Sequence, residues 1–125
     1  MRYYFISLVI LVAVLIGQIA GLHGIYISET LYLMVMHLAG GFGIGLFIMS
    51  LVREKPFGRQ KMVIIMVVGA LIAGLLWEAI EVYYNISGYH LWTHMYYIDT
   101  ARDLANDIIG GALATLFLVG NTHKN

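Results

Sequence analysis

Cysteine is absent from the 125-residue sequence, and charged residues make up only 11 % of it. Without cysteine, disulfides and thiolate chemistry are excluded. Seven basic residues balance seven acidic ones and form no long run, so no nucleic-acid-binding surface is expected. No stretch is left for a soluble domain either, because apolar runs fill the chain apart from a short basic stretch and a polar loop.

Apolar residues are abundant, at 61 % of the chain against roughly half in soluble domains. A helix needs about 20 mostly apolar residues to cross a bilayer, and four windows qualify, at about 4–22, 31–52, 62–85 and 101–119. Helices are expected because lipid offers the backbone no hydrogen-bond partners and the apolar pattern is continuous rather than alternating. We therefore predict an all-α integral membrane protein, with residues 1–125 forming a single four-transmembrane-helix bundle in the lipid bilayer.

The first window also fits a secretory signal peptide, since a basic residue follows the initiator and residues 19–21 resemble a loose cleavage site. Its apolar run is long for a signal, however, and residues 17–21 form a small-residue face of the kind that packs membrane helices together. Similar faces occur at 41–45 and 70–74. They predict a retained first helix, close helix packing, and a capacity to form a homo-oligomer through small-residue faces.

Basic residues concentrate in the connection between the second and third windows, where only Glu54 opposes them. They are Arg53, Lys55, Arg59 and Lys61. Because loops rich in Lys and Arg remain in the cytoplasm, this connection is predicted to be cytoplasmic. With four spans both termini are then cytoplasmic too, and the connections 23–30 and 86–100 face outward.

Ionisable residues inside membrane spans are costly and are by default functional candidates. Here they gather near the predicted outer ends of three helices, roughly 6 to 12 Å inside at about 1.5 Å per residue. The set comprises His37, Glu78, Glu81, Asp103 and Asp107. Helical spacing places the two glutamates on one face of the third helix, and the two aspartates together with Asp99 on one face of the fourth, beside Asn106.

Five carboxylates at close range cannot all stay ionised in a poorly hydrated site without a counter-charge, and Arg102 is the only fixed cation nearby in the sequence. A divalent metal ion is one answer, because Asp, Glu and His are common ligands. Protons are the other, with several acids remaining neutral. A structural interpretation also exists: Thr100 fits an N-cap with Asp103 at the third helical position, and His37 alone fits a hydrogen-bonded packing residue.

Three motifs resemble the core helices of the VanZ-like superfamily. They are a His followed by small residues at 37–42, Trp-Glu-Ala-Ile-Glu at 77–81, and Asp-Thr at 99–100 with Asp-Leu-Ala-Asn-Asp-Ile-Ile-Gly at 103–110. VanZ-like proteins carry Gln where Glu81 stands, and this departure is more similar to the YjdF-type inner-membrane proteins, which have a paired-Glu helix. The resemblance implies a multi-pass protein of a bacterial or archaeal cell (inner) membrane. The change at Glu81 argues against the glycopeptide-resistance role linked to VanZ.

For function, the leading hypothesis is a metal-dependent membrane enzyme that acts on a lipid-linked or envelope substrate in the outer leaflet. The candidate ligands or acid/base groups are Glu78, Glu81 and Asp103, with His37 as a fourth ligand or proton carrier, Asp107 as a further metal ligand, and Asn106 as an orienting hydrogen-bond partner. Two other classes stay open. One is a binding or transport protein coupled to protons or a divalent ion, and the other is a structural accessory subunit of a membrane complex.

Overall fold

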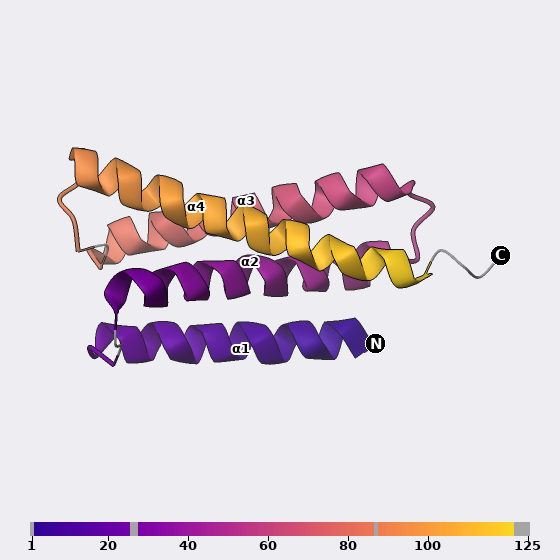
Figure 1. Ribbon diagram of the computed structural model, residues 1–125, viewed down its shortest axis with the longest axis horizontal. Helices are drawn as coiled ribbons and strands as arrows, with labels where there is room; N and C mark the ends of the chain where they lie inside the picture. The colour runs from indigo at the N-terminus through magenta and orange to yellow at the C-terminus, as the bar shows by residue number, and fades with distance from the viewer. Residues whose placement is uncertain (1, 26–27, 87, 122–125) are drawn as a thin grey trace.

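The computed structural model describes residues 2–25, 28–86 and 88–121, and its regular elements are all helical (Figure 1). The helices are α1 (Arg2–Leu22), α2 (Glu29–Val52), α3 (Arg59–Tyr84) and α4 (His94–Ala114), followed by the 3-10 helix η1 (Thr115–Asn121). Successive helices run in opposite directions along the long axis of the molecule, as Figure 1 shows. The expectation of an all-helical chain is confirmed.

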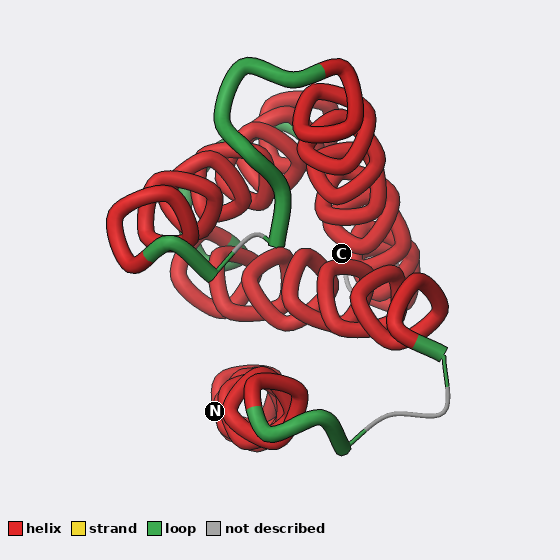
Figure 2. Tube along the Cα trace, turned by 90° about the vertical axis from the view of Figure 1, so that its left-hand side faces the viewer, coloured by secondary structure: helices red, strands yellow, loops and turns green. Residues whose placement is uncertain are grey.

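Helices α2, α3 and α4 pack against one another and enclose the interior of the bundle, whereas α1 lies outside this triangle (Figure 2). Within the described ranges, the backbone of α1 approaches closely only that of α2. Most of the large apolar side chains of α1 are exposed, including Phe5 and Ile16 at 68 % and 62 % of their surface. One face of α1 is therefore available to lipid or to another molecule.

The two ends of the bundle differ in charge. The end of α1 and the start of α2 lie at one end of the bundle, next to the end of α3 and the start of α4. Glu29 and Asp99 belong to this end, and we call it the acidic end. The connection 53–58 lies at the other, basic end, where the Arg53 guanidinium sits 5.5 Å from the ring centroid of Tyr3. The apolar core belongs to the basic half. It is formed by Leu46, Met49, Met66, Ala114 and Leu118.

Glycines allow α2 and α4 to cross closely. A Cβ atom at Gly41 would overlap the backbone oxygen of Asp107, and one at Gly110 would overlap that of Leu38. Close approach of small residues is the usual way for membrane helices to gain van der Waals contact. The close packing expected at 41–45 is confirmed, and here the glycines bring together two helices of the same chain. Homo-oligomer formation through small-residue faces, like retention of the first helix, stays a prediction.

The fourth helix differs most from expectation. It begins at His94, seven residues before the predicted window, because Thr93 acts as the N-cap and its hydroxyl accepts from the Tyr96 amide at 3.3 Å. Thr100 is therefore not a cap, and Asp99 lies inside the helix rather than at its start. Three helices, α1, α2 and α3, are long and apolar enough to cross a membrane. α4 is not among them, because four charged residues interrupt it: Asp99, Arg102, Asp103 and Asp107.

Candidate metal centre near the acidic end

Three helices bring one acid or imidazole each to a common point inside the bundle. His37 on α2, Glu78 on α3 and Asp103 on α4 each offer a ligand atom, and these atoms lie within 4.8 Å of one another. We call these residues the His–Glu–Asp cluster. All three side chains are buried, with 4 %, 7 % and 2 % of their residue surfaces exposed. The sequence prediction that three helices contribute to one group of ionisable residues thus agrees with their placement.

The imidazole of His37 lies between two carboxylates of α4. Its Nδ1 is 3.2 Å from Oδ2 of Asp107, and its Nε2 is 3.6 Å from Oδ2 of Asp103. An ionised carboxylate can only accept, so the hydrogen bond to Asp107 requires the proton on Nδ1. In the neutral ring, Nε2 then carries a lone pair directed to the side of Asp103. Asp107, predicted as a further metal ligand, lies against the opposite ring nitrogen of His37, so the geometry favours an orienting role over direct ligation.

Several buried polar atoms at this point lack a hydrogen-bond partner among the described residues. They are Nε2 of His37, Oε1 of Glu78, Oδ1 of Asp103, Nδ2 of Asn106 and Nε of Arg102. Leaving such an atom unsatisfied inside a protein costs about 1–3 kcal/mol, and more for a charged group. Two members of the cluster, His37 and Glu78, therefore present lone pairs with no donor to meet them. Asn106 adds a buried donor without an acceptor.

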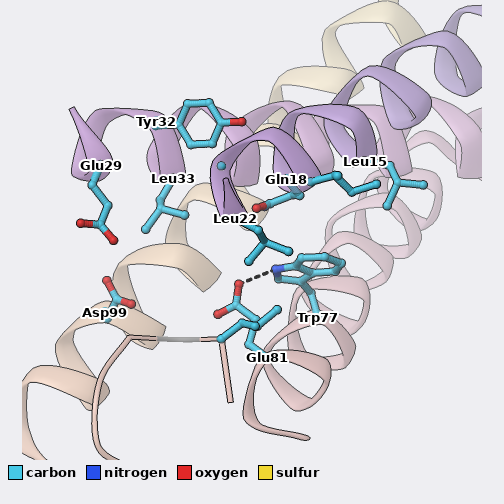
Figure 3. Close-up of a pocket in the computed structure, with 12 residues that line it drawn as sticks. Leu15, Gln18, Leu22, Glu29, Tyr32, Leu33, Trp77, Glu81 and Asp99 are labelled. Carbon is cyan, nitrogen blue, oxygen red and sulfur yellow. Dashed lines mark hydrogen bonds between the residues drawn. The ribbon is translucent and has the colours of Figure 1, made fainter. Parts of the chain in front are cut away.

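Two residues that the sequence analysis did not assign to the site hold its glutamates in place. The Thr100 hydroxyl donates to Oε2 of Glu78 at 2.7 Å, which leaves Oε1 as the free oxygen. The indole N–H of Trp77 donates to Oε1 of Glu81 at 2.7 Å, within α3 (Figure 3). The i,i+4 spacing of Trp77 and Glu81 is a signal that could have indicated the second bond. The first joins two helices and depends on their register.

The acids outside the cluster have different surroundings. Glu81 lines a hollow at the acidic end together with Glu29 and Asp99, so its carboxylate is accessible from that hollow (Figure 3). Asp99 accepts a hydrogen bond from the guanidinium of Arg102. The same guanidinium lies 3.5 Å from Oδ1 of Asp103, an ion pair without hydrogen-bond geometry. Arg102 therefore offsets part of the negative charge, as expected from its position in the sequence.

The geometry of the His–Glu–Asp cluster suits a single divalent cation. Ligand distances of about 2.0 to 2.6 Å place two ligands on opposite sides of one ion about 4 to 5 Å apart. The 4.8 Å limit on the separations in the cluster falls in that range. One imidazole and two carboxylates form a donor set used by Zn²⁺, Mn²⁺ and related ions. Such an ion would bind Nε2 of His37 and Oε1 of Glu78, which have no hydrogen-bond partner among the described residues.

These observations define the class of the protein: a helical membrane protein with a buried His/Glu/Asp group. The chain belongs to the family described as predicted membrane protein (DUF2238), whose model matches residues 3–124. No curated protein and no solved structure matches it. The family match supports the membrane assignment and is consistent with the YjdF-type resemblance, whereas similarity to VanZ-like proteins stays a prediction.

Proposed function

We propose that this protein is a metal-dependent membrane enzyme in which His37, Glu78 and Asp103 hold a divalent cation next to a lipid-linked or envelope substrate. The observation that carries the proposal is the convergence of these three side chains from three helices. Among the described residues, Nε2 of His37 and Oε1 of Glu78 meet no hydrogen-bond donor. Burying uncompensated negative charge at such a point is expensive. A cation would remove that cost.

The proposal includes four membrane spans, with α4 as the fourth. α4 has 21 residues, the same length as α1, and it lies along α2 and α3 with its aspartates buried against them. Ionisable side chains within a span are tolerated when they face the bundle interior and find partners there. By the positive-inside rule, the basic end and both termini then face the cytoplasm, and the site lies in the outer half of the inner membrane.

Three further residues have roles in the proposed chemistry. When bound, the cation supplies Lewis-acid polarisation of a substrate oxygen. Glu81, which is accessible from the hollow, acts as the acid/base group: it takes the proton of an attacking water and returns it to the oxygen of the leaving group. Asn106 donates its free amide hydrogen to a substrate oxygen or to a ligand. Asp107 keeps Nε2 of His37 unprotonated and oriented.

A second candidate function is proton-coupled binding or transport, and one observation favours it. The ring of His37 lies between Asp107 and Asp103, at 3.2 Å and 3.6 Å, so a doubly protonated imidazolium would face a carboxylate on each side. In this alternative a proton on Nε2 takes the place of the metal ion. The two candidates differ in their response to chelator, which has no effect on a protonated site.

Metal analysis of the purified, detergent-solubilised protein tests the proposal. We expect about one divalent ion per chain after loading with Zn²⁺ or Mn²⁺, and a loss of at least tenfold in affinity for Asp103→Asn. The matched control is Glu54→Gln, which removes an exposed carboxylate from the connection at the basic end and should leave binding unchanged. Absence of stoichiometric metal in the wild type, or equal binding by the two variants, would reject the metal site.

A further inference from the structure

Two hollows adjoin on the side of the bundle where α1 faces α3. The first lies at the acidic end and the second lies deeper in the bundle, and each is partly open to the surroundings. Leu15, Gln18 and Trp77 line both. We call the combined space the α1–α3 groove.

The groove is apolar at one end and acidic at the other. In its deeper part the walls are mainly apolar, with Leu11 and Val14 on α1 and Ala70 and Ala73 on α3. From Leu11 to Leu22, α1 covers about 16 Å of its length at about 1.5 Å per residue. Within the described ranges, the backbone of α1 closely approaches only that of α2, so α1 and α3 are not packed directly against each other along the groove. Its shape and polarity match an amphiphile with its chain parallel to the helices.

The groove reaches the His–Glu–Asp cluster. His37 and Asp107 form part of the wall of the deeper hollow, and Glu81 forms part of the wall of the outer one. His37 is buried, with only 4 % of its surface exposed, and its Nε2 has no hydrogen-bond partner among the described residues. This atom lies 3.6 Å from Oδ2 of Asp103, so the groove ends at the imidazole that belongs to the His–Glu–Asp cluster.

The charge of the outer hollow indicates which kind of ligand head group it would bind. Three carboxylates line it, those of Glu29, Glu81 and Asp99, and in Figure 3 the carboxylates of Glu29 and Asp99 point toward each other from α2 and α4. None of the described residues that line this hollow carries a positive charge. Arg102 bonds to Asp99 but is not part of the lining. A phosphate or carboxylate head group would meet like charges here, whereas an ammonium group would find complementary ones.

We propose that the α1–α3 groove binds an amphiphile with a single hydrocarbon chain and an amine-bearing head group, with the amine held by Glu29, Glu81 and Asp99. This inference names the substrate class of the proposed enzyme and rests on that function only for what happens after binding. The hydrocarbon chain lies against Leu15 and Ala73, and the head group ends beside the His–Glu–Asp cluster.

Fluorescence quenching of Trp77 by brominated amphiphiles tests the inference. Trp77 lines both hollows, and the other tryptophan, Trp92, is 77 % exposed and can be replaced by Phe, so that selective excitation of tryptophan reports on Trp77. Titration of the detergent-solubilised Trp92→Phe protein with a chain-brominated long-chain alkylamine should give saturable quenching. A brominated alkyl phosphate of the same chain length should need at least about tenfold more ligand.

Matched variants show whether the groove is responsible. Ala73→Phe fills the deeper hollow and should abolish saturable quenching, whereas Ile72→Phe adds bulk at an exposed neighbour that does not line it and should preserve it. The Glu81→Gln/Asp99→Asn double variant should reduce the preference for the amine without preventing binding of the chain. Because it leaves the apolar walls intact, it tests the inference even if Ala73→Phe misfolds.

Three results would overturn the inference: equal affinity for amine and phosphate, wild-type quenching by Ala73→Phe, or a dimer in detergent that Ala73→Phe dissociates. The last would assign the groove to a second copy of the chain. All titrations are run both with chelator and with added Mn²⁺. Amphiphile binding that survives in chelator, in a protein that takes up no metal, would support the groove while rejecting the metal-dependent function.

Discussion

Gly74 on α3 makes room for the carboxylate of Asp107 on α4, because a Cβ atom at Gly74 would overlap Oδ2 of that carboxylate. The same Oδ2 atom is the one that lies 3.2 Å from Nδ1 of His37. A position that the sequence suggests is a helix-packing glycine therefore has a second role. It sets the place of the acid that orients the histidine, and through the histidine it affects the His–Glu–Asp cluster.

Replacement of Gly74 by alanine should therefore weaken the site. The added methyl group must displace the Asp107 carboxylate, and overpacking of this kind costs about 1–3 kcal/mol of the free energy of unfolding. Gly40→Ala is the matched control, because a Cβ there would meet its nearest neighbour, Val14, only at 3.9 Å. That control should be neutral or stabilising by about 0.5–1 kcal/mol. Thermal unfolding in detergent and metal titration of both variants measure the difference, and equal behaviour would contradict the role of Gly74.

The Asp107→Asn variant separates orientation from ligation. If Asp107 acts by holding the Nδ1–H of His37, the amide should keep the stoichiometry of one metal ion per chain and lower its affinity by about 10- to 100-fold. A direct ligand would instead change the coordination itself, which X-ray absorption or the visible spectrum of the Co²⁺-loaded protein detects. An altered Co²⁺ spectrum with one fewer carboxylate ligand would return Asp107 to the ligand set.

Much of this arrangement was predictable from the sequence, and the parts that were not depend on tertiary contacts. Windows of apolar residues locate α1, α2 and α3 to within a few residues, since the demand for satisfied backbone groups in lipid leaves few alternatives. Helical spacing also predicts that the acids of α3 and α4 share faces. Spacing alone cannot show which nitrogen of His37 meets which aspartate, because that depends on how α2 crosses α4.

The start of α4 illustrates a different limit. Both Thr93 and Thr100 are chemically able to cap a helix, and an apolarity criterion favours Thr100 because the residues before it are aromatic and polar. The helix nevertheless continues back to Thr93, and Thr100 instead donates to Glu78 across the bundle. The apolar groove between α1 and α3 was also unpredictable, since it arises from the position of α1 outside the three-helix triangle.

The two threonines offer a direct experimental contrast. Thr93→Val should lower the stability of the protein by about 1 kcal/mol through loss of the cap, with metal affinity unchanged. Thr100→Val leaves Oε2 of Glu78 without its donor, so it should cost about 1–3 kcal/mol and also weaken metal binding about tenfold. Chemical denaturation and metal titration are compared for the two variants. A larger effect of Thr93→Val on metal binding would reverse the assignment of cap and site.

The coupling between Glu78 and Asp103 distinguishes metal from protons. With a shared cation, Glu78→Gln and Asp103→Asn each remove most of the stabilisation by the bound ion. Their effects on the free energy of unfolding should therefore be strongly non-additive, with a coupling of about 0.5–3 kcal/mol. Chelator should lower the stability of the wild type to that of the variants. If protons neutralise the acids, the amides should be neutral or stabilising, because an amide mimics a protonated acid. Effects that add and ignore chelator would leave the proton-coupled alternative.

The orientation of the chain is the prediction on which the location of the site depends. Because the sequence contains no cysteine, single cysteines can be introduced without a background of other thiols. Glu54→Cys places a thiol at an exposed position of the basic end and keeps all of its basic residues, while His90→Cys places one at an exposed position between α3 and α4 at the acidic end. The excess of Lys and Arg should retain the basic end in the cytoplasm.

On intact cells, a membrane-impermeant maleimide should therefore label His90→Cys, and should label Glu54→Cys only after permeabilisation. Labelling of both thiols after permeabilisation serves as the control for accessibility. The reverse pattern in intact cells would place the His–Glu–Asp cluster in the cytoplasmic half of the membrane, and an envelope substrate could then not reach it.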